Sequence, residues 1–434
     1  MNKIGLRKEE KAFEARVAIV PSHAKQLKAK HGIEILVEPS NQRAFNPDEF
    51  LEADAAMSQL EGDNASVILG IKEMPIDFFE PEKVYIFFSH TIKGQKSNMP
   101  MLQKFLDIGA TLIDYERVVD EKGRRLIYFG NWAGMAGISD TFRVLGEILT
   151  FKGIKPNPFA GMKTTLECKG LPELKEEFRK LANRIKEDGL PESMRPFIVG
   201  FAGYGNVSQG AQEMFDILPH ETISPENLGN ASPKSNILYK CIFKEEDMVE
   251  PIDSSADFDL QDYYDNGAAK YQGIFHNYVQ HLTMIMNCIY WTKKSPRLIT
   301  KEFIRNHWED DTRKLHIIGD ISCDVGGAIE FTVKCTHADK PAFTYLLDED
   351  RADMDITDKG PVVMAVDNLP CELPREASTS FSETLIPFIP NLAKADFTVP
   401  FEDLQLPREL LDAVIVYRGK LTKNFEYLNQ YLKG

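Results

Sequence analysis

The stretch Pro196-Phe-Ile-Val-Gly-Phe-Ala-Gly-Tyr-Gly-Asn-Val-Ser-Gln-Gly-Ala211 joins an apolar run to a glycine loop and then to a helical pattern. The run 196–201 predicts a buried strand, and apolar residues recur from Ala211 to Leu218 at the spacing of one helix face. In such a unit the first glycine permits a tight turn, and the second lets a pyrophosphate approach the start of the helix. We therefore predict a dinucleotide site in an α/β fold. The predicted contacts are Gly203, Tyr204, Gly205, Asn206 and Val207.

The loop departs from the usual three-glycine pattern, because Ser208 stands where the third glycine is expected. Close packing of the helix must then accommodate Ser208 or use Gly210 and Ala211. A tight turn without a ligand is the alternative interpretation. The acidic residue that binds the adenosine ribose is expected about 20 residues further on, near Ile223 and Ser224, and no acid stands squarely there. This favours NADP(H) over NAD(H), because a misplaced carboxylate repels a 2′-phosphate less.

Short, nearly continuous apolar runs alternate with polar, helix-capable segments along the rest of the chain. This pattern is typical of parallel sheets that are buried on both faces. In the first part of the chain the runs are 16–20, 34–38, 66–71, 84–88 and 111–114. After the glycine loop, the strand candidates are 238–243, 284–290 and 315–319, and a helical pattern begins at 374.

We therefore predict an α/β protein with two Rossmann-like domains, a cleft between them, and a C-terminal segment that returns to the first domain. The substrate domain is expected at 1–135 plus 376–434, and the dinucleotide-binding domain at 136–375. The small residues that follow Phe129 predict a long helix, which either crosses between the domains or is an ordinary buried helix. The segment 253–275, rich in Asp and Tyr, predicts a surface excursion.

The composition excludes several classes of protein. A formal net charge of −15 argues against a general nucleic-acid binder, because binding phosphates needs a basic surface. No apolar run approaches the roughly 20 residues of a membrane span, and the first residues lack the apolar core of a signal peptide. The six cysteines show no C-x-x-C pair, which predicts reduced thiols and no metal site. We expect a cytoplasmic protein, without a nucleic-acid or membrane partner, whose oligomeric state stays open.

Ionisable residues follow several of the predicted strands in the first domain. Lys72 and Glu73 follow 66–71, His90 follows 84–88, and Glu116 follows 111–114. Because the carboxyl ends of neighbouring parallel strands share one edge, we expect Lys72, His90 and Glu116 to meet there. A partly desolvated lysine and a histidine can exchange protons near neutral pH. The alternative is that each of these charges simply faces solvent.

At this point the sequence resembles a known family. Glu14-Ala-Arg-Val-Ala-Ile-Val-Pro21 is similar to the opening motif of alanine dehydrogenases, transhydrogenase nucleotide domains and lysine-forming saccharopine dehydrogenases. Gly70-Ile-Lys-Glu-Met-Pro75 and Ser89-His-Thr-Ile-Lys-Gly-Gln95 narrow the resemblance to the saccharopine branch, and especially to the lysine–ketoglutarate reductase half of aminoadipic semialdehyde synthase. Further matching segments are 112–116, 129–134, 205–211, 295–300, 320–331, 367–370 and 373–377. The chain ends where that half is expected to end, without the companion saccharopine-oxidising domain.

The resemblance implies roles for particular residues. Lys72 and His90 carry the acid–base steps, and Glu73 and Glu116 tune Lys72. The implied substrate contacts are Arg16 and Lys93, which bind carboxylates, and the implied residues near the nicotinamide are Asp320 and Asp324. Fusion-type relatives tend to use NADPH and stand-alone fungal ones NAD(H), so both nucleotides stay open.

The implied reaction is the reversible NAD(P)H-dependent condensation of L-lysine with 2-oxoglutarate to give saccharopine. One alternative is a related opine-type or amino-acid dehydrogenase with another amine and keto acid. Another is a non-catalytic NAD(P)-binding regulator. Loss of Lys72 or His90 would mark such a regulator, and both residues are present.

Overall fold

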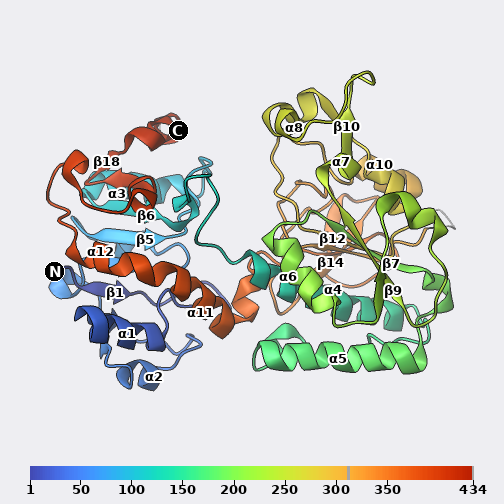
Figure 1. Cartoon of the computed structure of the whole chain (residues 1–434), viewed down its shortest axis with the longest axis horizontal. Helices are drawn as coiled ribbons and strands as arrows, with labels where there is room; N and C mark the ends of the chain where they lie inside the picture. The colour runs from blue at the N-terminus through green and yellow to red at the C-terminus, as the bar shows by residue number, and fades with distance from the viewer. Residues whose placement is uncertain (310–312, 433–434) are drawn as a thin grey trace. The chain divides into compact units, whose positions relative to one another are not determined.

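The computed structural model describes residues 1–309 and 313–432, which form two compact units. Unit 1 comprises Met1–Phe129 and the chain from Pro374 onward, and unit 2 comprises Gly130–Leu373. Each unit contains an eight-stranded, mostly parallel sheet with helices packed on it (Figure 1). The predicted α/β class with two parallel sheets is confirmed.

The sheet of unit 1 has the order β18-β17-β6-β5-β4-β1-β2-β3, and its first six strands along the chain are parallel. These strands are β1 (Ile4–Leu6), β2 (Ile35–Val37), β3 (Ala56–Met57), β4 (Val67–Leu69), β5 (Val84–Phe87) and β6 (Thr111–Asp114). The C-terminal segment adds β17 (Val414–Tyr417) antiparallel to β6, followed by β18 (Lys420–Leu421). The helices are α1 (Pro21–His31), α2 (Pro47–Leu51), α3 (Met99–Ile108), α11 (Pro374–Leu385), α12 (Ile389–Lys394), α13 (Arg408–Leu411) and α14 (Asn429–Leu432).

Both faces of this sheet are buried, which explains the continuous apolar runs. In β4, Val67 and Leu69 belong to one core cluster with Phe381 of α11, whereas Ile68 belongs to another with Phe105 of α3. Fully burying such a side chain contributes roughly 1.5–3 kcal/mol. A three-residue strand is therefore held mainly by its side chains and by neighbours on both sides.

The predicted strand at 16–20 was wrong, because this segment is an irregular loop. Its apolar side chains are buried, but the backbone N–H groups of Val17 and Val20 donate to Ser378 Oγ and Ser382 Oγ of α11, at 3.0 and 3.1 Å. The sheet instead uses β1, which the sequence analysis did not predict. Serine hydroxyl oxygens of α11 thus accept hydrogen bonds from backbone N–H groups that would otherwise pair with a neighbouring strand.

The sheet of unit 2 has the order β15-β14-β16-β13-β12-β7-β9-β8, parallel from β8 to β16. Its strands are β7 (Phe197–Ala202), β8 (His220–Thr222), β9 (Leu238–Phe243), β12 (Met284–Asn287), β13 (Ile317–Asp320), β14 (Ala342–Leu346), β15 (Arg351–Asp353) and β16 (Val362–Met364). The helices are α4 (Gly130–Phe151), α5 (Leu171–Asp188), α6 (Asn206–Phe215), α7 (Glu245–Met248), α8 (Leu260–Asn266), α9 (His276–Val279) and α10 (Lys301–His307). The expected excursion contains β11 (Tyr271–Gly273). This strand pairs with β10 (Val249–Pro251), which lies just before the excursion, in a separate two-stranded sheet.

Two glycines let α4 and α6 approach each other closely. A Cβ on Gly134 of α4 would lie 2.0 Å from the backbone oxygen of Val207, and one on Gly210 of α6 would lie 2.0 Å from that of Asn131. Gly210 therefore serves helix–helix packing, and Ser208 is accommodated as a buried residue of α6. The whole of α4 belongs to unit 2 and contributes to its core, as an ordinary buried helix does.

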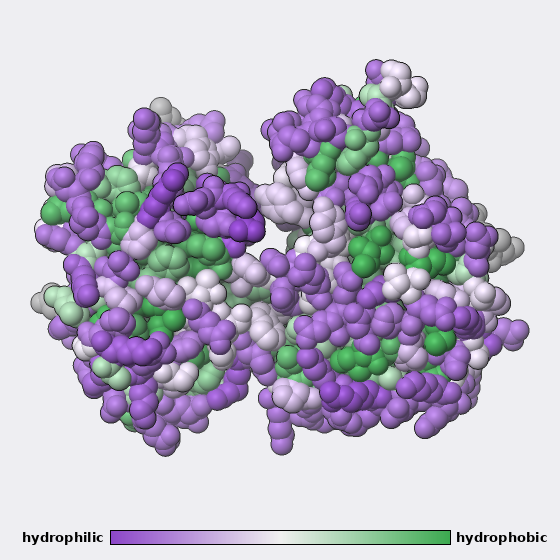
Figure 2. Space-filling model, in the orientation of Figure 1, coloured by the Kyte–Doolittle hydropathy of each residue, from purple (hydrophilic) through white to green (hydrophobic). Residues whose placement is uncertain are grey.

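Hydrophilic side chains cover most of the visible face of each unit, with apolar residues in small groups (Figure 2). Within residues 1–309 and 313–432, no helix has the length and apolar character that crossing a membrane requires. Over the same residues, no cluster of three His, Cys, Asp or Glu side chains has a geometry suited to a metal ion.

Candidate functional site

A lysine, a glutamate and a histidine come together at the carboxyl ends of β4 and β5 in unit 1. Lys72 and Glu73 follow β4, and His90 follows β5. His90 Nδ1 and Glu73 Oε1 form a hydrogen bond that is also an ion pair when the imidazole is protonated. Both side chains are about one-third exposed, so the pair is open to a ligand. The structure therefore brings three of the predicted site residues together.

The backbone holds His90 in an unusual conformation. Its φ is +50°, in the left-handed region that non-glycine residues rarely adopt. The imidazole stacks on Phe88, with centroids 6.4 Å apart and planes 18° apart, and Asn98 Nδ2 donates to the His90 carbonyl at 3.0 Å. Strain of this kind persists only where the surrounding contacts over-determine it.

A buried network supports the turn that carries His90. Asp114, at the end of β6, accepts hydrogen bonds from the backbone N–H of Ser89 at 3.0 Å and from its hydroxyl. The second carboxylate oxygen of Asp114 accepts from the N–H of Glu116 at 2.7 Å. Burial raises the pKa of Asp114 to about 6, although these hydrogen bonds oppose the shift. Asp114 thereby ties the ends of β5 and β6 together.

The pKa of Lys72 lies below its ordinary value. Desolvation is the largest cause, followed by the positive charges of Arg16 and Lys11, while Glu73 and Glu14 act in the opposite direction. A lowered pKa makes the neutral amine available at lower pH than in a solvated lysine. Burial alone would raise the pKa of Glu73, but its hydrogen bond to His90 and the charges of His90 and Lys72 outweigh burial, and its pKa is lowered.

Glu9 is a site residue that the sequence analysis missed. Its two carboxylate oxygens accept from the backbone N–H groups of Ile71 and Lys72, at 2.6 and 3.0 Å. Desolvation and the nearby charge of Glu14 raise its pKa to about 7. The available signal was its position just after β1, and that strand had not been predicted. Glu9 thus fixes the backbone from which Lys72 projects.

Arg16 forms an ion pair with Glu14, a completely buried acid. Its Nε donates to Glu14 Oε1 at 2.7 Å, its Nη2 donates to Glu14 Oε2, and its guanidinium lies 4.1 Å from the centroid of the Phe129 ring. Arg16 is itself only 2% exposed, yet its charge acts on Lys72. The structure therefore places Arg16 beside the lysine, with one edge of its guanidinium already bound.

Glu116 and Lys93 are placed differently from the residues around Lys72. Glu116 forms an ion pair with Arg125 and is absent from the charges with the largest effects on the Lys72 pKa. Lys93 is exposed in the turn that follows His90. Among the acids, Glu73 and Glu14 have the largest effects on the Lys72 pKa.

The glycine loop of unit 2 makes a tight turn between β7 and α6. Gly203 has a φ of +91°, which favours glycine, and its N–H donates to the Phe243 carbonyl of β9 at 2.9 Å. A Cβ on Gly205 would meet no atom within 4 Å, so the loop leaves open space where α6 begins. The first N–H groups of α6, from Asn206 onward, lack partners within the helix and can bind a pyrophosphate.

The strand order changes where an acid that could bind a ribose is expected. Residues near Ile223 follow β8, but the strand that pairs directly with β7 is β9. The residue at the corresponding strand end is Glu245, which begins α7. Glu245 accepts a hydrogen bond from Tyr264 at 2.8 Å, and after desolvation its charge is the main cause that raises the pKa of Tyr204 in the glycine loop. Because β8 and its following loop intervene, the end of β9 lies further along the chain than the usual spacing of about 20 residues.

Asp320 and Asp324 differ sharply in exposure. Asp320 ends β13 and is 1% exposed, with its oxygens accepting from Asn287 Nδ2 at 2.7 Å and Thr332 Oγ1 at 2.5 Å. Burial raises its pKa to about 6. Asp320 therefore organises the strand ends, whereas Asp324 is exposed on the loop beyond β13.

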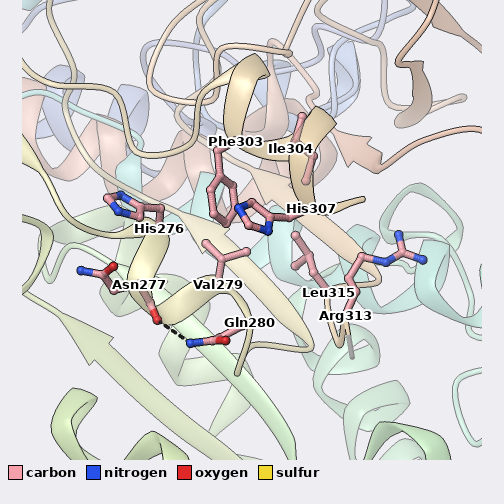
Figure 3. Close-up of a pocket in the computed structure, with 9 residues that line it drawn as sticks. All are labelled: His276, Asn277, Val279, Gln280, Phe303, Ile304, His307, Arg313 and Leu315. Atoms are coloured by element: carbon pink, nitrogen blue, oxygen red, sulfur yellow. Dashed lines mark hydrogen bonds between the residues drawn. The ribbon is translucent and has the colours of Figure 1, made fainter. Parts of the chain in front are cut away.

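A separate cavity of about 230 Å³ lies between α9 and α10 of unit 2. Figure 3 shows His276, Phe303 and His307 gathered around it, with Arg313 directed to one side. None of the predicted site residues lines this cavity.

Comparisons with known proteins agree with this architecture. Residues 5–136 match the family "Alanine dehydrogenase/PNT, N-terminal domain", and residues 260–424 match "Alanine dehydrogenase/PNT, C-terminal domain". The chain is similar to L-alanine dehydrogenase in structure, with a TM-score of 0.61, 15% identity and 99% of each chain covered. It is also similar to a transhydrogenase from Sinorhizobium meliloti, with a TM-score of 0.57 and 14% identity over 96% of this chain and 99% of that one. These two likenesses concern the fold.

Curated relatives are closer in sequence. The alpha-aminoadipic semialdehyde synthase of Arabidopsis thaliana is 35% identical over 97% of this chain and 41% of its own length. The mitochondrial one of Bos taurus is 31% identical over 98% and 47%. The NAD(+), L-lysine-forming saccharopine dehydrogenase of Emericella nidulans is 29% identical over 89% of this chain and 91% of its own. The chain thus spans less than half the length of the synthases it matches, and the predicted resemblance is confirmed.

Proposed function

The chain belongs to the alanine dehydrogenase/PNT family of NAD(P)-dependent oxidoreductases, and we propose that it condenses L-lysine with 2-oxoglutarate reductively to give saccharopine. The observation that carries this proposal is the group formed by Lys72, Glu73 and His90 at the ends of β4 and β5. Relatives of the chain are named alpha-aminoadipic semialdehyde synthase and L-lysine-forming saccharopine dehydrogenase, and these names support the choice of substrates.

We assign the proton transfers to this group. The ε-amine of the substrate lysine must lose a proton before it adds to the keto carbon, and the carbinolamine must then lose water to give an imine. Lys72, with its lowered pKa, accepts and returns a proton in these steps, while His90 holds or releases one through its free ring nitrogen. Gly203, Gly205 and the first N–H groups of α6 would hold the dinucleotide, which would supply the hydride for the reduction.

Cationic side chains have to bind the carboxylates of two substrates in an acidic protein. We assign this role to Arg16 and Lys93, as the resemblance implies. Glu14 accepts hydrogen bonds from Nε and Nη2 of Arg16, so a substrate carboxylate binds to a guanidinium that is already paired with an acid. The pair holds the guanidinium in a fixed orientation, which favours a planar anion.

For the nucleotide we propose NAD(H) over NADP(H). The preference for NADP(H) in the sequence analysis rested on the lack of an acid near Ile223. Because β9 pairs directly with β7, we take Glu245, just after β9, as the acid at the ribose position. A carboxylate beside the glycine loop accepts hydrogen bonds from a ribose diol and repels a 2′-phosphate. Lys244 precedes it, but its ammonium lies 3.6 Å from Glu246 Oε1, which offsets part of its charge.

Glu245→Gln is expected to narrow the preference for NADH over NADPH by about tenfold, which corresponds to about 1.4 kcal/mol. The amide removes the negative charge that repels a 2′-phosphate and keeps one acceptor for the ribose. Dissociation constants for NADH and NADPH, measured by nucleotide fluorescence at one ionic strength, check this. Lys244→Ala is the matched comparison at the neighbouring position. A wild-type protein that binds NADPH more tightly, with Lys244→Ala removing that preference, would contradict the proposal.

Oxidation of NADH or NADPH, followed at 340 nm, tests the reaction itself. We expect turnover only when lysine and 2-oxoglutarate are both present, since the imine needs both. Each substrate is omitted in turn, and other amines and keto acids replace them in parallel assays. Turnover with a different pair would reassign the substrates, and oxidation that never needs both an amine and a keto acid would exclude a condensing reductase.

A further inference from the structure

Two cysteine thiols lie against each other on the loop that follows β13. Cys323 Sγ and Cys335 Sγ are 3.8 Å apart, and both residues are partly exposed. The other four cysteines, Cys168, Cys241, Cys288 and Cys371, are buried. The two cysteines that are more accessible than the other four are thus in van der Waals contact with each other in unit 2.

The surroundings of the two thiols hold them on a common support. Cys323 Sγ lies 3.6 Å from the carbonyl oxygens of Ala365 and Val366. Thr336, next to Cys335, donates its N–H to the same Ala365 carbonyl at 2.8 Å. Both ends of the 323–335 loop are thus anchored to the segment after β16. The approach from 3.8 Å to the S–S length of about 2.05 Å requires a shift of roughly 2 Å.

We propose that Cys323 and Cys335 form a reversible thiol–disulfide modification site that responds to low-molecular-weight disulfides. The Cys335 thiolate attacks one sulfur of an oxidised small disulfide, and one small thiolate leaves. Cys323 then loses its proton and attacks the Cys335 sulfur, and the second small thiolate leaves. Two protein thiols are oxidised and one small disulfide is reduced to two thiols, which take up the two protons.

The environment gives the two sulfurs different roles. The contact with Cys323 lowers the pKa of Cys335 below its ordinary value, and the same contact, together with burial, raises the pKa of Cys323. We assign the attack to Cys335 and the resolution to Cys323, an order that the two serine variants test. By contrast, burial raises the pKa of Cys168 to about 11 and that of Cys241 to about 12.

Closure of the disulfide would restrain the loop that carries Asp324. Thr332, within this loop, donates to the buried Asp320, and Gly326 donates its N–H to the Thr332 carbonyl at 2.9 Å. A shift of Cys323 toward Cys335 therefore acts on the strand end of β13. We expect the oxidised protein to bind NADH at least threefold more weakly. This consequence rests on the proposed function, whereas formation of the disulfide does not.

The test treats the full chain with millimolar oxidised glutathione and then with dithiothreitol. Thiols titrated under denaturing conditions should fall from six to four on oxidation and return to six on reduction. Trypsin cuts after Lys334, so the two cysteines end in different peptides, and mass spectrometry should find these joined. The NADH dissociation constant is measured on both forms.

Three variants complete the design. Cys323→Ser should trap glutathione on Cys335, and Cys335→Ser should keep its remaining thiols reduced under the same conditions. Cys168→Ser, at a buried site, should still form the 323–335 link. A wild-type thiol count that stays at six, or a link between other cysteines, would overturn the modification site. A link with an unchanged NADH affinity would overturn its effect on the nucleotide, and no NADH binding by the reduced protein would count against the proposed function instead.

Discussion

Lys72→Met is expected to lower kcat by about 10²- to 10⁴-fold, the range that a general acid–base group contributes. Methionine keeps the length and the apolar part of the side chain but cannot accept or donate a proton. Because the glycine loop belongs to unit 2, the dissociation constant for NADH should stay within about twofold. Steady-state kinetics with lysine and 2-oxoglutarate, together with nucleotide titration, measure both quantities. His90→Gln, which keeps a hydrogen-bonding side chain beside Glu73, is expected to cause a loss of the same order.

Lys25→Met provides the matched control, since it removes a lysine from an exposed position on α1 of the same unit. Its kcat and KM should equal those of the wild type. Full turnover in both Lys72→Met and His90→Gln would remove the acid–base assignment. A loss of turnover in the control as large as in Lys72→Met would trace the effect to the charge of the protein rather than to the site.

Gly134→Ala is expected to destabilise the protein by about 2 kcal/mol or more. The new methyl group would lie 2.0 Å from the Val207 backbone oxygen and 2.6 Å from the Ala211 nitrogen, so backbone has to move. Because the clash is with backbone, we expect its cost at or above the upper end of the usual 1–3 kcal/mol for overpacking, about 3 kcal/mol or more, which exceeds the gain of about 1 kcal/mol in helix propensity by about 2 kcal/mol or more. Since Val207 lies in the first turn of α6, the affinity for the dinucleotide should fall as well. Denaturant unfolding measures the change as a lower midpoint with an unchanged m-value.

Gly229→Ala is the control for this substitution. Its Cβ would approach only His281 Cε1, at 3.9 Å, which is an ordinary contact. We expect its midpoint to differ little from that of the wild type. Equal midpoints for Gly134→Ala and the wild type would show that α4 and α6 are less tightly packed than the structure has them.

Local patterns in the sequence were sufficient for most of the sheet framework. The strand, glycine loop and helix around Gly203 lie where the pattern predicts them, as β7 and α6. The runs that gave β2, β4, β5 and β6 were recognisable because burial on both faces makes a strand continuously apolar. The motifs around Lys72 and His90 predicted the family, which the comparisons confirm.

The same local patterns gave a wrong prediction where side chains from a distant segment accept the backbone hydrogen bonds. The apolar run 16–20 was predicted as a strand because its side chains are buried. Its Val17 and Val20 N–H groups instead donate to the hydroxyl groups of Ser378 and Ser382. Glu9 was overlooked for the complementary reason, since β1 has only three residues and follows a charged start. Its carboxylate nevertheless binds the backbone that carries Lys72.

By itself, then, the sequence determined the α/β class, the glycine loop and the identity of the acid–base candidates, because periodicity, turn glycines and short motifs are local properties. Only the tertiary structure decided which strands are neighbours, and hence that Glu245 rather than a residue near Ile223 stands beside the glycine loop. It also placed Glu73 and Glu14 where their charges oppose those of Arg16 and Lys11 on the Lys72 pKa, and it paired Glu116 with Arg125. Coulomb interactions and desolvation depend on distance and burial, which spacing along the chain does not contain.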